Sequence, residues 1–584
     1  MADRREHPGV PDDPASRWRR VLGRRGLRLG LGALVLAVAC AGLTAAYFRQ
    51  SLTAPFTSDG AVNVLQAQAM IHGNPLLRGW WTSDVSFYTT ELPEYALVTA
   101  IRGLAPNVVH ICGALTYTLT VLLTALVARG RERGAAGWYR AGIALGITLA
   151  LSVTGSIGIF LQNPNHAGTA VPVLVLLLLL DRAEGRTSDR VGGRWLVPVA
   201  VCAVLALAEV GDELTVAVAT VPLGVVCIVR LTTGRLSGGG QRSRAEVLLE
   251  RALLAAAVVS VGLARLANLV IRALGGFDLR PVAGVAVAPL SRVPANVGLL
   301  WQTILLLFGA NQPGTPHQAQ MISAHALVVL MSALHVVGLL LAGAALAAGI
   351  ASLCARRADR VAQVIVVAIL VLLVVGAFST LLRSRSYVHE VAILLPLGAA
   401  LAGRVLAPLA GRLPARRRTV KIGALALAAW LALNLAEVCY AATWPAQPPS
   451  QQAVAAWLAA HHERDGLAGY WQAASTTVTS GGQVLVAAIT LPAAAAAGLP
   501  GTDQAAAYRW ESSADWYQPA RHDATFVIAV TDPAAPGGGG LPVTEVRARF
   551  GRPAAQYQIG QDVIMLYDYN LLTRLTATAF PGAG

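Results

Sequence analysis

Charged residues are scarce in this sequence: of its 584 residues, 13% are charged and 55% are hydrophobic. So low a charged fraction, with a mean hydropathy of +0.56, excludes a soluble globular chain and a disordered one. The 57 glycines and 30 prolines are spread without a period, which excludes collagen-like repeats. The sequence therefore predicts an integral membrane protein.

Cysteine is also rare, and all six residues lie within or at the ends of apolar runs, at positions 40, 112, 202, 227, 354 and 439. None can form a disulfide bond in the polar segments, and no cysteines and histidines cluster at the short spacing of a zinc site. The sequence thus predicts neither a disulfide-stabilised secreted domain nor a bound metal.

Apolar runs long enough to cross a bilayer, about 20 residues each, occur eleven times. They lie at 27–48, 108–128, 139–160, 167–180, 195–210, 213–229, 252–274, 325–353, 361–382, 387–403 and 420–442. If the N-terminus is cytoplasmic, the inner segments hold 30 of the 46 basic and 11 of the 31 acidic residues, a net charge of +19, which leaves −4 elsewhere. This asymmetry predicts an inside N-terminus and an outside C-terminus, and it explains the total of +15 without a nucleic-acid partner.

A shorter apolar stretch at 297–309 is expected to be re-entrant or interfacial rather than a twelfth crossing. After Trp444 the composition changes to PAQPPSQQ, followed by a helical pattern near 451–463 and strand-like runs at 483–491, 523–530, 543–550 and 557–569. We predict a cytoplasmic basic tail (1–26), a transmembrane helical domain (27–444) with a large first outer loop (49–107), and an extracytoplasmic α/β domain (445–584).

The first outer loop carries four acidic residues, of which Asp59 lies eleven residues beyond Phe48. The others are Asp84, Glu91 and Glu94. The stretch 62–71 is amphipathic, so we expect an interfacial helix there. Four aromatic residues are typical of a belt at the membrane interface: Trp80, Trp81, Phe87 and Tyr88.

This layout resembles the GT-C superfamily of membrane glycosyltransferases, which use polyprenyl-phosphate-linked sugars and include the protein O-mannosyltransferases and lipid A aminoarabinose transferase. In that superfamily a large first outer loop carries an acidic residue shortly after the first span, and many members end in an extracytoplasmic domain. Asp59 in TSDGA matches that position. Many members have two adjacent acids there, whereas Gly60 follows Asp59, so we assign no metal.

Sugar transfer needs a base that deprotonates the acceptor hydroxyl and cations that hold the departing lipid phosphate. Asp59 is the candidate base, with a helix N-cap at Ser58 or Asp59 as the alternative. Arg383 and Arg385 are scarce outer cations, and arginine matches phosphate oxygens with a planar fork. His389 and Glu390 follow one turn on and could join that site, although Arg385 could equally pair with Glu390.

Arg265 and Arg272 lie seven residues apart on one helix face, and a charge as deep as Arg265 usually faces a cavity or a partner. The alternative is that Arg265 neutralises Glu209, Asp212 or Glu213 at the tip of the preceding hairpin. The remaining substrate-binding candidates are Asp84, Glu91, Asn165 and His166, the last two in the short connection QNPNHAGT, where turn chemistry is the plainer explanation.

Together with these residues, the resemblance implies an inverting transfer of a sugar from a polyprenyl-phosphate donor to an unknown glycan, lipid or protein acceptor at the outer face of the plasma membrane. Two alternatives remain open. A lipid or glycan transporter would use Arg265 and the hairpin acids as coupling groups. A non-catalytic assembly protein of the cell envelope would use the outer domain to bind a partner.

Overall fold

The structure is a computed structural model, and all that follows concerns the residues it describes. These are residues 14–152, 155–162, 165–184, 196–233, 244–280, 286–311, 325–354, 359–382, 385–410, 417–491, 505–532 and 539–576.

Long helices form most of the described chain up to residue 441, as the apolar runs predict. They are α1 (Pro14–Ser51), α4 (Asn107–Arg129), α5 (Gly134–Thr148), α6 (Ala170–Glu184), α7 (Leu196–Gly211), α8 (Val221–Thr233), α9 (Arg244–Ala273), α10 (Val293–Leu307), α12 (His325–Cys354), α13 (Arg360–Phe378), α14 (Leu394–Ala410) and α15 (Arg417–Ala441). Among the described residues, eight helices are long and apolar enough to cross a membrane. The polytopic helical fold is confirmed, and the number of crossings stays a prediction.

Four short helical segments accompany these helices: the π-helices η1 (Gly158–Gln162) and η3 (Val216–Thr220), and the 3-10 helices η4 (Leu290–Arg292) and η5 (Arg385–Val391). Together, η4 and α10 form an 18-residue apolar segment that is long enough to cross a membrane. The stretch at 297–309 is therefore part of a longer helix than the sequence suggested, because Pro294 stands at the start of α10, where proline favours a helix.

Buried ion pairs join the helix ends that the sequence predicts to face the cytoplasm. The Nη2 atom of Arg404 lies 2.6 Å from Asp181 and 2.9 Å from Asp359. Glu250 accepts hydrogen bonds from Arg360 at 2.6 Å and from Arg230 at 2.8 Å. Each charge buried here has a partner of opposite sign, as burial requires, and the contacts link α6, α8, α9, α13 and α14.

The first loop folds into α2 (Ser58–Ile71), the short strand β1 (Trp80–Trp81) and α3 (Leu92–Arg102). The amphipathic helix predicted at 62–71 is present, but it begins four residues earlier. Residues 60–67 of α2 are buried, and the helix packs against α3 and α17. It is thus enclosed by protein in the structure instead of lying on a membrane surface.

The C-terminal part contains a seven-stranded sheet with the strand order β4-β3-β2-β6-β9-β8, and β7 pairs with β6. Parallel pairing joins β2 to β3 and β6, and β6 to β7, whereas the β3–β4, β6–β9 and β8–β9 pairs are antiparallel. The strands are β2 (Asp465–Ala468), β3 (Leu485–Thr490), β4 (Ala506–Ala507), β6 (Ala524–Val530), β7 (Leu541–Pro542), β8 (Ala555–Ile559) and β9 (Asp562–Leu566). The helices beside it are α16 (Gln452–Ala460), α17 (Tyr470–Thr479), α18 (Val543–Phe550), η7 (Ala514–Tyr517) and η8 (Leu571–Arg574).

One predicted strand is wrong, since residues 543–550 form helix α18. Pro542 precedes the first turn, which contains Glu545, and Arg547 and Arg549 lie in the last turn. That charge order suits the helix dipole. Val546 and Phe550, four residues apart, are buried on one face. The alternation of apolar and polar residues in VTEVRARF had instead indicated a strand.

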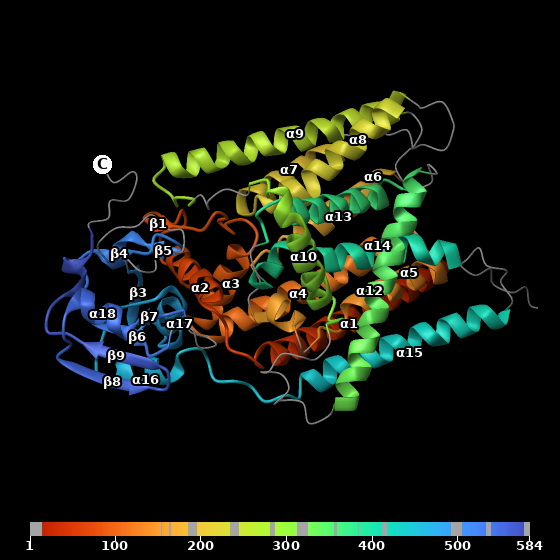
Figure 1. The fold of residues 1–584 in the computed structure, drawn as a ribbon. Coiled ribbons are helices and arrows are strands. Elements are labelled where there is room, and N and C mark those ends of the chain that lie inside the picture. The colour runs from red at the N-terminus through yellow and green to blue at the C-terminus, as the bar shows by residue number, and fades with distance from the viewer. Residues whose placement is uncertain are drawn as a thin grey trace, which may run out of the picture.

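The sheet-containing part docks directly onto the first loop, and Figure 1 shows the two side by side at one end of the helix bundle. Strand β1 pairs antiparallel with β5 (Ser512–Ser513), which matches Trp80 with Ser513. Trp81 has no exposed surface and belongs to a hydrophobic cluster formed mainly by the C-terminal part. The expected aromatic belt is therefore corrected here: Trp80, Trp81 and Phe87 are buried between protein segments.

Candidate functional site

A buried histidine, His166, lies where three segments that are distant in the sequence meet. Its Nδ1 atom is 2.9 Å from Oδ2 of Asp212, and its Nε2 atom is 3.8 Å from Oε1 of Glu390. The ring of His389 stacks on the His166 ring, with 5.5 Å between the centroids. The structure thus unites residues that the sequence had placed in three separate groups. We call His166, Asp212, Glu390 and His389 the histidine cluster.

Within this cluster, Asp212 is held in place by several hydrogen bonds. It lies between α7 and η3 and is completely buried. The hydroxyl of Thr169 donates to its Oδ2 atom, and the backbone N–H of Leu214 donates to Oδ1 at 2.9 Å. With His166 as a further partner, both oxygens are satisfied, as a buried carboxylate requires. In the sequence analysis Asp212 was one of the hairpin acids that could neutralise Arg265 or serve as coupling groups of a transporter.

The first loop is tied to the same place by hydrogen bonds to the end of α7. The backbone N–H of Phe87 donates to Gly211 O at 2.8 Å, and the Ser86 hydroxyl donates to Val210 O at 2.9 Å. The Phe87 ring meets His166 edge-on at 5.2 Å. Phe87 and His166 both have positive φ, at 50° and 61°, a conformation that costs energy outside glycine and gathers at functional sites.

The charges of the cluster stabilise one another. Burial alone would lower the pKa of His166, but the neighbouring carboxylates of Asp212 and Glu390 raise that pKa well above its usual range. Burial alone would raise the pKa of Asp212, but the His166 charge and its hydrogen bonds lower it. The two groups therefore form an ionised pair at neutral pH.

Two candidate acids of the first loop lie within electrostatic reach of this pair. Glu91 is 2% exposed, and burial together with the Asp212 charge raises its pKa to about 8. Burial also raises the pKa of Asp84, against the attraction of His166. Glu91 is therefore protonated at neutral pH and can donate a hydrogen bond, a role that its sequence position did not indicate.

Asp59 lies in the first turn of α2, where a negative charge is favourable. The residue before the helix is Thr57, which makes no side-chain cap, so neither Ser58 nor Asp59 holds the N-cap position. The Tyr470 hydroxyl lies 2.5 Å from Oδ1 of Asp59 and also within hydrogen-bond distance of Oε2 of Glu511. Asp59 is half-buried, which leaves part of its surface accessible.

The remaining predicted residues fall in several places. Asn165 accepts a hydrogen bond from Asn63 at 2.8 Å in the protein interior. Arg265 pairs with Glu213 at 2.7 Å and Arg272 with Asp278 at 3.6 Å, and both arginine side chains are 65% exposed. Arg265 therefore forms an ion pair with one of the hairpin acids, which was the alternative to a role in a cavity.

The structure describes the two proposed phosphate ligands, Arg383 and Arg385, only in part. Arg383 lies outside the described residues. Arg385 begins η5, four residues before His389, and only its backbone is described. Their role therefore stays a prediction.

Sequence reasoning missed Tyr470 and Glu511, which come from the C-terminal part and meet Asp59. Tyr470 is the first residue of the short helix α17 and carried no signal that would distinguish it from other aromatic residues. Glu511 was a single acid in a segment without periodicity. Its φ of 48° depends on the tertiary fold and could not be predicted from the sequence.

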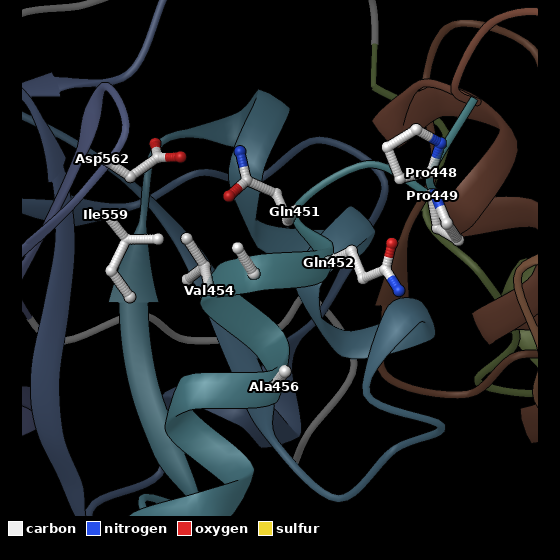
Figure 2. A pocket seen from close by; sticks show the side chains of 9 residues that line it. Pro448, Pro449, Gln451, Gln452, Val454, Ala456, Ile559 and Asp562 are labelled. Atoms are coloured by element: carbon white, nitrogen blue, oxygen red, sulfur yellow. The ribbon is translucent and has the colours of Figure 1, made fainter.

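His166, His389 and Glu390 present ligand atoms that all lie within 4.8 Å of one another, close enough to share a cation. The sequence assigned no metal, and that assignment stays a prediction. A separate hollow of about 500 Å³ lies between Pro448, α16 and Asp562, and Figure 2 shows its lining. None of its lining residues belongs to the histidine cluster or to the Asp59 contacts.

No known family model matches the sequence, and no curated protein matches it. Solved structures that match the chain include the following two. The oligosaccharyltransferase of Archaeoglobus fulgidus, tethered with an acceptor peptide, has 10% identity and a TM-score of 0.44, with 84% of this chain and 69% of that chain covered. ArnT from Cupriavidus metallidurans, bound to undecaprenyl phosphate, has 13% identity and a TM-score of 0.50, with 94% and 99% covered.

ArnT is a GT-C membrane glycosyltransferase. The comparison with ArnT extends over nearly the whole of both chains, including the helical part and the C-terminal sheet. The chain therefore has the fold of the GT-C membrane glycosyltransferases.

Proposed function

We propose that this protein transfers a sugar from a polyprenyl-phosphate-linked donor to an acceptor hydroxyl, with Asp59 as general base. The observation that carries the proposal is that segments distant in the sequence bring several carboxylates and His166 within electrostatic reach of one another. Glu511, which contacts Asp59 through Tyr470, also interacts electrostatically with Asp84, and Asp84 interacts with His166 and Asp212. Such a grouping of perturbed acids in one place is typical of acid–base chemistry.

In the proposed step, Asp59 takes the proton from the acceptor hydroxyl as the acceptor oxygen forms a bond to C1 of the sugar. The bond between C1 and the phosphate oxygen breaks, and its electron pair leaves with the lipid phosphate. Attack from the face opposite the leaving phosphate inverts the configuration at C1. A positioned base of this kind typically contributes about 10²- to 10⁴-fold to the rate.

The leaving phosphate needs positive charge, which we assign to Arg383 and Arg385. Arg385 belongs to η5, which also carries His389 and Glu390 of the histidine cluster. The protonated His166, which stacks on His389 of the same segment, would add a further cation. ArnT has been solved with undecaprenyl phosphate bound, and a lipid phosphate of this class is the product that the proposed reaction would release.

The transporter alternative gains no support from its own candidate residues. Arg265 and Glu213 pair with each other, and their side chains are 65% and 47% exposed. A pair outside the protein interior is poorly placed to couple ion movement to substrate movement, because coupling groups face the bundle interior or a water-filled cavity.

The test uses the purified full chain in lipid vesicles with a panel of polyprenyl-phosphate sugars labelled in the sugar. We expect lipid phosphate to be released and label to appear on an acceptor added as a mixture of envelope glycans, lipids and proteins. Arg385→Ala should raise the donor concentration needed for half-maximal rate, because a lost charge-assisted bond costs about 1.5 to 3 kcal/mol. Movement of intact donor across the vesicle membrane, with no release of lipid phosphate, would contradict the proposal and favour a transporter.

A further inference from the structure

Three residues distant in the sequence meet at one hydroxyl group. Asp59 comes from the first turn of α2, Tyr470 is the first residue of α17, and Glu511 directly precedes β5. The Tyr470 hydroxyl lies 2.5 Å from Oδ1 of Asp59, and within hydrogen-bond distance of Oε2 of Glu511. Two of the three residues therefore come from the C-terminal part of the chain.

The surrounding packing fixes all three backbones. Helices α2 and α17 are joined where Ser58 donates a hydrogen bond to Trp471 O at 2.8 Å and approaches the Ser475 hydroxyl at 3.0 Å. Strand β5 is held by its pairing with β1. Glu511 itself has a φ of 48°, which is rare for a residue with a side chain and needs support from its surroundings.

The number of protons in this arrangement is limited. A tyrosine hydroxyl has one proton to donate, yet it contacts two carboxyl groups. The second contact needs another proton, because two carboxylates and one O–H group cannot form two hydrogen bonds. One carboxyl group must therefore be protonated, and the buried one is Glu511, which is 6% exposed, whereas Asp59 is half-buried.

The other charged groups around Glu511 agree with this assignment. Burial and then the Asp59 charge raise the pKa of Glu511 to about 8, and Asp84 adds to the rise. Arg509, two residues before Glu511 in the sequence, and Arg280 both lie over the Trp81 ring, at 5.7 Å each. The nearest acids therefore favour a neutral Glu511.

We propose that Tyr470 and Glu511 are positioning residues of the transfer reaction: Glu511 donates its proton to the Tyr470 oxygen, so that the Tyr470 hydroxyl donates to Asp59 and holds this base toward the acceptor. The proposal rests on the function of Asp59 proposed above. It gives the C-terminal part of the chain a direct effect on the chemistry, beyond packing against the first loop.

This arrangement predicts a specific dependence on pH. Below about pH 8, Glu511 is neutral and the proton of Tyr470 points to Asp59. When Glu511 loses its proton, its carboxylate competes for the same Tyr470 proton, and Asp59 loses its donor and faces a second negative charge. The rate should therefore fall as the pH rises through the Glu511 pKa of about 8.

The first experiment measures single-turnover transfer against pH for the full chain and two variants. In Glu511→Gln, the amide donates to the Tyr470 oxygen at every pH, so the loss of rate at alkaline pH should disappear. In Tyr470→Phe, kcat should fall about 10- to 100-fold, the effect of losing one hydrogen bond to a charged group, and the KM for the donor should stay unchanged. Glu545→Gln and Tyr557→Phe are the matched controls from the same sheet-containing part.

The second experiment needs no transfer activity and so separates this proposal from the proposed function. Infrared spectra are recorded during a pH titration, and those of Glu511→Gln are subtracted from those of the wild-type chain, which removes the band of Glu91, whose pKa is also about 8. The remaining protonated carboxyl band should belong to Glu511 and disappear near pH 8. Tyr470→Phe should shift the frequency of that band, since it removes the hydrogen-bond partner. Absence of this difference band would overturn the proposal, as would wild-type pH profiles in folded Glu511→Gln and Tyr470→Phe.

Discussion

Replacing Asp212 with asparagine should destabilise the protein strongly, because it leaves the charge of His166 without its partner. Asp212 is completely buried, and its Oδ2 atom lies 2.9 Å from Nδ1 of His166. Removing one member of a buried ion pair typically costs about 3 to 5 kcal/mol. We expect a loss of that size in the free energy of unfolding of Asp212→Asn.

The pH dependence of this loss follows from the two pKa shifts. The raised pKa of His166 means that its contribution is complete below the ordinary histidine pKa of about 6.5 and declines as the pH rises through the higher value in the folded state. The lowered pKa of Asp212 means that its contribution is complete above about pH 4 and is lost in acid. The mutation should therefore cost most between about pH 4 and 6.5.

The assay is reversible unfolding in mixed detergent micelles, with His166→Gln and the double variant completing a mutant cycle. The coupling between the two sites should reach at least about 1 kcal/mol. Asp523→Asn, at an exposed position of the C-terminal part, is the control and should change stability by less than about 0.5 kcal/mol. A loss below about 1 kcal/mol in Asp212→Asn, or additive effects in the cycle, would refute the pairing on which the histidine cluster depends.

Three further predictions concern other parts of the structure. Because the pKa of Glu91 is raised to about 8, its contribution to stability should be lost as the pH rises from about 4.5 to about 8, so thermal unfolding of Glu91→Gln should depend less on pH in that range; equal slopes in the two proteins would contradict this. Trp81→Ala removes a fully buried ring from the contact with the C-terminal part, at a cost of about 3 to 5 kcal/mol, so limited proteolysis should cut near residues 445–451 faster than in the exposed-site control Trp138→Ala; unchanged cleavage would contradict the docking role. A tag after Gly584 should be accessible only from outside the cell, and labelling from the cytoplasm would reverse the proposed orientation.

The sequence predicted the helical part of the fold well because each apolar run had a length set by the bilayer. The run predicted at 108–128 is helix α4 (Asn107–Arg129), and the run at 420–442 is α15 (Arg417–Ala441). The strands at 483–491 and 523–530 were also predicted, because continuous apolar runs of that length suit buried parallel strands. Residues 543–550 failed, since apolar residues at both two- and four-residue spacings left the period ambiguous.

The candidate site was only partly predictable. Asp84, Glu91, His166, His389 and Glu390 were all named from the sequence, but nothing in it showed that they meet around Asp212. That meeting depends on backbone hydrogen bonds such as that from Phe87 to Gly211, which link segments more than 100 residues apart. The roles of Tyr470 and Glu511 were not predicted for the same reason, because their contact with Asp59 depends on the packing of α17 against α2 and on the pairing of β1 with β5.

The rate of a single turnover with a labelled polyprenyl-phosphate sugar, compared between the wild-type chain and Asp59→Asn, tests the central claim most directly. Asparagine keeps the shape of the side chain but cannot take a proton, so the rate should fall by about 10²- to 10⁴-fold while donor binding persists. If folded Asp59→Asn transferred sugar at the wild-type rate, Asp59 would not be the base, and the account of the site would be contradicted.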